Sequence, residues 1–137
     1  MRTSEKFNEN IILLDPYQLR SHEEIRLSRA LFILFKIILA GNFTMPLLID
    51  SKTKTILDGH HRRWVACRLK FKSVPCYSID YLSDEKVRVY GRRPEIFVDK
   101  SQVINTALER KLFPHKTTRH EYKIPEFEPL SLDELWK

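Results

Sequence analysis

The residues best suited to chemistry lie in one short run, residues 58–62, which reads DGHHR. Its glycine permits a tight turn, and the first main-chain N–H groups of a following helix have no partners within that helix. Phosphate groups bind well at a helix start, because the free donors and the helix dipole act together. Arg62, His60 and His61 add charge-assisted donors. The run therefore predicts a phosphate-binding turn.

Asp58 would repel phosphate at such a site unless a divalent cation lay between them, so the run implies Mg²⁺ held by Asp58. The simpler alternative is that Asp58 only caps the helix, but a cap gives no role to His60 or His61. Zinc is a competing use of histidines. Two adjacent histidines rarely bind one ion, and no H-x-x-x-H pattern or cysteine pair supplies further ligands. A phosphate turn with magnesium is the better interpretation.

A second basic segment, residues 115–120, reads HKTTRH. Its side chains after the first histidine are cationic or carry hydroxyls: Lys116, Thr117, Thr118, Arg119 and His120. This composition fits the capture of a carboxylate or a phosphate, since a guanidinium can grip either anion with two hydrogen bonds. Taken alone, however, the segment is explained slightly better as a solvated basic loop.

The third histidine-bearing segment begins at Ser21 and reads SHEE. Ser21 followed three residues later by Glu24 is a capping box, so we expect a helix that starts here and ends at Gly41. His22 and Glu23 would then lie in the exposed first turn. An acid there usually does no more than complement the helix dipole. Glu23 becomes a catalytic candidate only if the fold brings the three segments together.

Further elements must position these segments. Strands are expected near 11–15, 46–50, 54–57, in SVPCYSIDYL and in KVRVY. Helices are expected after Gly59 and in DKSQVINTALERKLF, which Pro114 ends. The tail shows little periodicity before SLDELW. This alternation of short strands and helices indicates one α+β domain.

Length and composition narrow the class of protein. A chain of 137 residues is long enough for one domain, residues 1–137. The net charge of +6 suits an anionic partner, either nucleic acid or the phosphates of a nucleotide. No signal peptide is visible, and the apolar run ALFILFKIILAG is too short to cross a bilayer, so we expect a core helix. Cys67 and Cys76 are expected to be free thiols in a reducing cytoplasm.

Together, the three segments resemble the motifs of the free serine kinases of the ParB/sulfiredoxin-like superfamily. Members of that family carry HE at the start of the first helix, a DGHHR turn and a C-terminal KTTRH, in the order found here. The resemblance covers most of the chain, from about residue 11 to residue 136. It implies an α+β fold with a small mixed sheet flanked by helices, in which residues 114–137 fold back to complete the substrate site.

The resemblance also implies roles for individual residues. Glu23 resembles the general base that takes the proton from the serine hydroxyl, and Asp58 resembles the acid that positions Mg²⁺ and the transferred phosphate. The implied nucleotide-binding residues are Gly41, Asp58, Gly59, His60, His61 and Arg62. The implied substrate-binding residues are His22, Lys116, Thr117, Thr118, Arg119 and His120.

The implied activity is phosphoryl transfer from ATP to free L-serine, giving O-phospho-L-serine, by a cytoplasmic monomer or small homo-oligomer. Some relatives use ADP, and longer relatives carry an insertion before KTTRH that is missing here, so ATP is favoured and ADP stays open. Arg92 or Arg93 stands where those relatives have an aromatic residue.

Two other branches of the superfamily offer alternatives. Sulfiredoxins place their catalytic cysteine where this chain has His60, so the nucleophile for sulfinic-acid repair is missing. ParB proteins carry a turn similar to GHHRRWVA, which makes a nucleotide-gated DNA-binding or regulatory module without kinase activity the alternative function. Such a chain would continue into a helix-turn-helix region, which the proline-broken tail does not resemble, so nucleic acid is not the expected partner.

Overall fold

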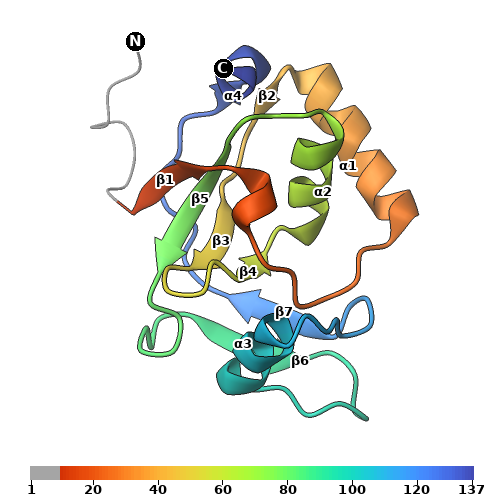
Figure 1. Cartoon of the computed structure of the whole chain (residues 1–137), viewed down its shortest axis with the longest axis vertical. Helices are drawn as coiled ribbons and strands as arrows, with labels where there is room; N and C mark the ends of the chain where they lie inside the picture. The colour runs from red at the N-terminus through yellow and green to blue at the C-terminus, as the bar shows by residue number, and fades with distance from the viewer. Residues whose placement is uncertain (1–9) are drawn as a thin grey trace.

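The computed structural model describes residues 10–137, which fold around a four-stranded sheet (Figure 1). The strand order is β1-β5-β3-β4, formed by Ile11–Leu14, Val74–Ile79, Leu47–Asp50 and Ile56–Asp58. Strands β1 and β5 are antiparallel, β3 is parallel to β5, and β4 is antiparallel to β3. The expected α+β fold with a small mixed sheet is confirmed, and the two strands of the predicted hairpin, β3 and β4, lie close to where the sequence places them.

Helices α1 (Leu27–Ala40) and α2 (His60–Arg68) pack against each other, and α2 also contacts β3. Helix α1 ends at Gly41, as expected, because a residue with a φ of 73° closes the last turn without the steric cost that a side chain would add. Helix α3 (Lys100–Leu108) begins at Asp99, whose side chain accepts a hydrogen bond from the N–H of Gln102.

The tail forms strands that the sequence does not predict. Strand β7 (Thr118–Glu121) pairs with β6 (Arg88–Gly91), and β8 (Leu130–Ser131) pairs with β2 (Asn42–Phe43). Helix α4 (Leu132–Trp136) follows β8, and a 3-10 turn, η2 (Pro16–Gln18), follows β1. Strand β7 contacts β4, so the tail returns beside the turn that follows β4 (Figure 1).

Strand β3 is buried on both faces and lies between two apolar clusters. Leu47 and Ile49 pack in one cluster with α2 residues, whereas Leu48 packs in a second cluster with Val103 of α3. Alternate residues of a strand point to opposite faces, so β3 contributes to both clusters. The cysteines are free thiols, as expected.

The expected start of the first helix at Ser21 is wrong. Helix α1 begins six residues later, and the preceding segment is extended because its main chain pairs with distant residues. The N–H of Phe113 donates to the carbonyl of His22, and the N–H of Glu24 donates to the carbonyl of Phe113. These bonds replace the expected capping box. As a result His22 is fully buried, whereas the first turn of a helix starting at Ser21 would have left it exposed.

The expectation that α1 is a core helix holds only in part. Ala30 and Ile37 are buried. Apolar side chains on the rest of its circumference are exposed: Leu27, Leu31, Phe32, Phe35, Ile38 and Leu39. Among residues 10–137, no helix has both the length and the apolar character needed to span a membrane.

Candidate active site

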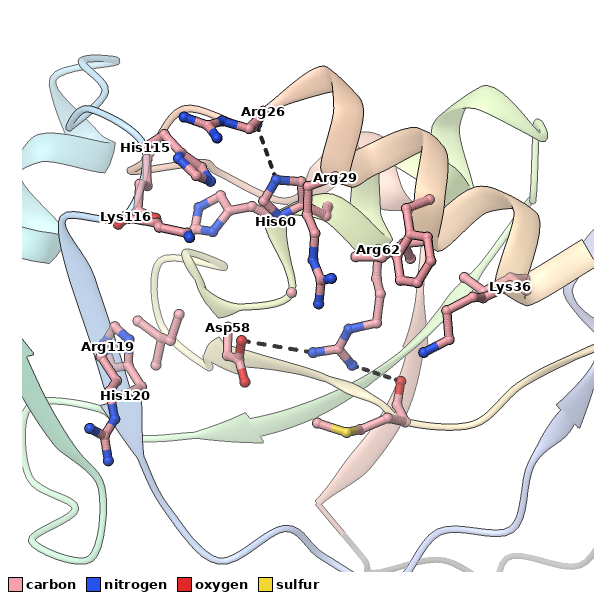
Figure 2. A pocket seen from close by; sticks show the side chains of 18 of the residues that line it. Arg26, Arg29, Lys36, Asp58, His60, Arg62, His115, Lys116, Arg119 and His120 are labelled. Carbon is pink, nitrogen blue, oxygen red and sulfur yellow. Dashed lines mark hydrogen bonds and ion pairs between the residues drawn. The ribbon is translucent and has the colours of Figure 1, made fainter. Parts of the chain in front are cut away.

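The three histidine-bearing segments meet around one large cavity of about 1090 Å³ (Figure 2). Its walls are formed by one side of α1, the turn between β4 and α2, and the start of β7 with the residues before it. Hydrogen bonds join segments that lie 38 and 95 residues apart in the sequence. The fold therefore supplies the condition under which Glu23 is a catalytic candidate.

Most of the predicted site residues line this cavity: Glu23, Asp58, Gly59, His60, His61, Arg62, Lys116, Thr118, Arg119 and His120. His22, Gly41 and Thr117 do not. His22 and Thr117 are fully buried, and the Thr117 hydroxyl donates to the carbonyl of Pro114. Gly41 ends α1, and its neighbours Ala40 and Asn42 reach the cavity wall instead.

Gly59 makes the turn between β4 and α2 possible. Its φ is 110°, and a Cβ atom at this position would overlap the side chain of Leu47. Any other residue would therefore be strained by its backbone and by the packing. Gly59 is also the N-cap of α2, and no side chain caps this helix. The alternative in which Asp58 caps α2 is wrong, and the helix start borders the cavity through Gly59, His60 and His61.

Asp58 is held by two neighbours. Its Oδ2 accepts a hydrogen bond from the Tyr122 hydroxyl at 2.9 Å, and its Oδ1 lies 3.9 Å from Nη2 of Arg62. Burial raises the pKa of Tyr122, with the adjacent Asp58 charge acting in the same direction, so the phenol stays a donor. Nη1 of Arg62 donates to the carbonyls of Met45 and Pro46, and Figure 2 shows the ion pair between Arg62 and Asp58. Arg62 thus bridges the carboxylate and the segment before β3.

A metal held by protein ligands alone does not fit this site. Within residues 10–137, no three His, Cys, Asp or Glu side chains are grouped to hold a metal ion. Mg²⁺ is commonly bound by one or two carboxylates together with substrate phosphates and water. Asp58 supplies one such carboxylate at the cavity wall. The residues present therefore fit a Mg²⁺ ion that arrives with a nucleotide.

The expectation that the histidines act as charged donors is wrong. Burial lowers the pKa of His22 to about 4 and that of His120 to about 3, and it holds the pKa of His60 well below its usual range. Nε2 of His60 accepts the N–H of His22 at 3.1 Å, and Nε2 of His61 accepts the N–H of Arg26 at the same distance. At neutral pH these imidazoles are uncharged, and His60 and His61 pair with main-chain groups of the segment before α1.

Glu23 has one carboxylate oxygen fixed by the tail. Its Oε1 accepts the N–H of Thr117 at 3.2 Å, and the N–H and hydroxyl of Thr118, both at 2.8 Å. Its other oxygen, Oε2, makes no hydrogen bond within the described part of the chain. Because Glu23 lines the cavity, this arrangement holds a carboxylate in a fixed place while leaving one oxygen for a ligand.

Six exposed basic side chains of the described chain surround the cavity: Arg26, Arg29, Lys36, Arg92, Lys116 and Arg119 (Figure 2). Three of these basic side chains come from α1 and the residue before it, and they belong to none of the sequence motifs described above. Arg26, Arg29 and Lys36 lie three and seven residues apart, a spacing that places them on one side of a helix. That spacing was the available signal. The spacing pointed to a binding site only once the other segments were known to face the same side of α1.

No family model matches the chain. It is 32% identical over 106 residues to an ATP-dependent L-serine kinase of Desulfurococcus mucosus. The matched stretch covers 74% of this chain and 41% of that protein. It is 36% identical over 90 residues to an ATP-dependent L-serine kinase of Staphylothermus marinus, covering 62% and 35%. A ParB-like protein of Sulfolobus acidocaldarius is 34% identical over 86 residues, covering 62% and 43%. The chain therefore spans less than half the length of these curated relatives.

Solved structures show the same fold. A conserved hypothetical protein from Pyrococcus furiosus superposes with a TM-score of 0.82 at 16% identity, covering 92% of this chain and 97% of that one. A free serine kinase in complex with AMP superposes with a TM-score of 0.79 at 14% identity, covering 92% and 93%. The chain thus has the ParB-like α+β fold. Within that fold it is a relative of the serine kinases.

Proposed function

We propose that the chain is a free L-serine kinase that transfers a phosphoryl group from ATP to the serine hydroxyl, giving O-phospho-L-serine. One observation carries the proposal: Glu23, Asp58 and the glycine turn before α2 border the same cavity, and basic side chains surround it. The identity to two ATP-dependent L-serine kinases supports the choice of phosphoryl donor and acceptor. The chain lacks the insertion expected of relatives that use ADP, so ADP is the second choice of donor.

Glu23 is proposed as the general base. As the new bond forms between the serine Oγ and phosphorus, the bond from phosphorus to the leaving diphosphate breaks. The serine hydroxyl loses its proton to Glu23, which later releases it to water. Three hydrogen bonds to Oε1 hold this carboxylate in place, and Oε2 is the oxygen left to accept the proton. Neutral His60 and His61 are not competing bases, because main-chain N–H groups occupy their Nε2 atoms.

The two sides of the cavity suggest where each substrate lies. Beside the C-terminal half of α1 the lining is more apolar, with Ile33, Ile37, Ala40 and Met45, and this suits a nucleotide base. Lys36 lies on that side, opposite Lys116 and Arg119 (Figure 2). The phosphates would then lie at the start of α2, where Asp58 would hold Mg²⁺. That ion would neutralise phosphate charge.

The proposed serine site consists of the cavity residues that are not assigned to the nucleotide. Lys116, Arg119 and the half-buried His120 border the cavity beside Thr118, and cationic groups there can bind the amino acid's carboxylate. Residues 114–137 would thus complete the substrate site of a single domain, residues 1–137. We propose that this domain acts in the cytoplasm as a monomer or small homo-oligomer.

The test is a direct assay. The purified chain is incubated with L-serine, Mg²⁺ and either ATP, ADP or CTP, and O-phosphoserine is measured by mass spectrometry. We expect product with ATP, no product without serine, and little product from a Glu23→Gln variant. The Glu24→Gln variant is the matched control, because Glu24 is an exposed neighbour outside the cavity. Absence of phosphoserine with every donor rejects the proposal.

The alternative, a nucleotide-gated DNA-binding or regulatory module, is favoured by the ParB-like relative and by the exposed basic side chains. The two functions differ in their dependence on salt. Binding to DNA through several Lys and Arg contacts weakens steeply between low and physiological salt. A gel shift that survives at physiological salt, in a chain that makes no phosphoserine, would support the alternative.

A further inference from the structure

One hydroxyl proton beside the proposed general base has two acceptors. The Thr118 Oγ lies 2.8 Å from Oε1 of Glu23 and 2.9 Å from Nε2 of His22. A threonine hydroxyl carries a single proton, so it can donate to only one of them at a time. Thr118 is almost fully buried and His22 is fully buried, so bulk water does not supply a second donor to His22.

The position of the His22 proton follows from its other contact. Nδ1 of His22 lies 2.7 Å from the carbonyl oxygen of Ile56, and a carbonyl can only accept a hydrogen bond. Nδ1 therefore carries the proton of the neutral ring. Burial lowers the pKa of His22 to about 4, so a second proton is absent at neutral pH. Nε2 is left as a lone pair that faces Thr118.

We propose that the Thr118 hydroxyl is a two-position switch that couples Glu23 to His22. While Glu23 is charged, the hydroxyl donates to its Oε1; once Glu23 has accepted the serine proton, the hydroxyl turns and donates to Nε2 of His22. No proton moves between heavy atoms in this step, since only the O–H bond rotates. His22 and Thr118 are positioning residues, and the inference rests on the proposed role of Glu23.

The switch makes Glu23 a more effective proton acceptor. Without an alternative acceptor, the hydroxyl would always stabilise the charged carboxylate and so oppose its protonation. His22 offers the hydroxyl a second partner, and this lowers the cost of neutralising Glu23. Thr118 contacts His22 directly and links it to the carboxylate of Glu23. The rings of His60 and His120 also pack against His22, with centroid distances of 4.6 and 6.0 Å, as does the uncharged ring of Phe113. None of these rings bonds to Nε2 of His22 in the described chain.

The kinetic test is a double-mutant cycle with His22→Leu and Thr118→Val. In the presence of Thr118, His22→Leu should lower kcat roughly 10-fold, which is the worth of about one hydrogen bond. The acidic limb of the kcat profile should also move to lower pH, because the hydroxyl then always donates to the carboxylate. In the Thr118→Val background, His22→Leu should change neither quantity further. Equal effects in both backgrounds would overturn the switch, and in Thr118→Ser, which keeps the hydroxyl, the response to His22→Leu should be retained.

A second measurement requires neither catalytic activity nor a folded His22 variant. Long-range ¹H–¹⁵N correlation spectra at pH 7 report which nitrogen of His22 is protonated and whether Nε2 accepts a hydrogen bond. We expect the Nδ1–H form, with the Nε2 signal moving toward the hydrogen-bonded position in Glu23→Gln and unchanged in Glu24→Gln. An Nε2–H form, or no response to Glu23→Gln, would overturn the inference. If the spectra behave as expected but no phosphoserine forms, the switch stands and the proposed function fails.

Discussion

The floor and the rim of the cavity differ in how their polar groups are held. On the floor, Thr118 and one oxygen of Glu23 are bonded at 2.8 Å, and the buried His22 lies behind them, 2.9 Å from Thr118, so each group has a defined partner. On the rim, Lys116 and Arg119 are exposed, and the Arg119 guanidinium lies 3.4 Å from Glu121 with both side chains more than half exposed. The floor resembles a protein interior, and the rim resembles an ordinary charged surface.

This difference separates two kinds of contribution. Buried polar groups are costly to leave without a partner, so a change on the floor should alter the rate or the stability. Exposed charges act at high dielectric and are screened by salt, so a change on the rim should alter mainly the affinity for substrates. Asp58 lies between the two regions, because its carboxylate is 43% exposed yet bonded to Tyr122.

The largest effect is expected on the floor, from Glu23→Gln. The change should lower kcat by about 10²–10⁴-fold, the usual contribution of a general base, and should leave the KM for nucleotide nearly unchanged. Steady-state kinetics measure both. Because Glu24 is exposed and caps no helix, Glu24→Gln should leave kcat and stability unchanged. A large loss of kcat in the Glu24 variant instead would show that the base has been misassigned.

Asp58→Asn tests the boundary between floor and rim. We expect activity to fall on the order of 10²-fold, together with the loss of the response to added Mg²⁺, since the amide cannot offset the charge of the ion. The check is a Mg²⁺ titration of the initial rate. Tyr122→Phe removes only the hydrogen bond to Asp58 and should cost a few-fold at most. An Asp58→Asn variant with full turnover would place the metal and the phosphate elsewhere.

Stability should fall in acid because of the buried histidines beside Glu23 and Thr118. The pKa values of His22 and His120 are about 4 and about 3 in the folded chain, below the ordinary value of 6.5. Below pH 6.5 the unfolded chain therefore binds protons that the folded chain does not. The free energy of unfolding should be highest above this pH and should fall by about 1.4 kcal/mol per unit and per histidine down to about pH 4.

Urea unfolding at pH 7.5, 6.0 and 5.0 measures this slope. His120→Asn should reduce the slope by the contribution of one histidine, because His22 and His60 still titrate below their ordinary pKa in the folded chain. A flat profile between pH 7.5 and 5.0 would mean that the floor is open to water and that the contrast with the rim does not hold.

The smallest effect is expected on the rim, from Arg119→Ala. The change should raise the KM for serine by about 10-fold or less and leave kcat nearly unchanged, because the side chain is 62% exposed and already near Glu121. The effect should shrink as the salt concentration rises. Arg88→Ala is the matched control, since Arg88 lies on the neighbouring strand β6 outside the cavity. A fall in kcat with KM unchanged would assign Arg119 to the transferred phosphate instead.

Much of the local structure could be predicted from the residues themselves. Gly41 ends α1 and Gly59 forms the turn before α2, and both have the positive φ that favours glycine. The hairpin of β3 and β4 follows from alternation and turn residues within short windows. Such features depend on chain geometry over a few residues, which the sequence records directly.

The start of α1 could not be predicted in this way. Ser21 and Glu24 form a sound capping signal, but Phe113 offers main-chain hydrogen bonds to the same segment. That competing partner lies about ninety residues away in the sequence, and no local sequence pattern indicates the pairing. The strand β7 was missed for the same reason, because its pairing with β6 is what makes it a strand.

The sequence by itself determined which chemical groups the site contains: the acids, the glycine turn, the histidines and the basic tail were all visible as residue types and spacing. Only the tertiary structure decided what each group does there. The histidines became neutral acceptors because packing removes water from their rings, and desolvation depends on neighbours rather than on spacing. Thr118 came to lie between Glu23 and His22 because the tail returns across 95 residues to meet them.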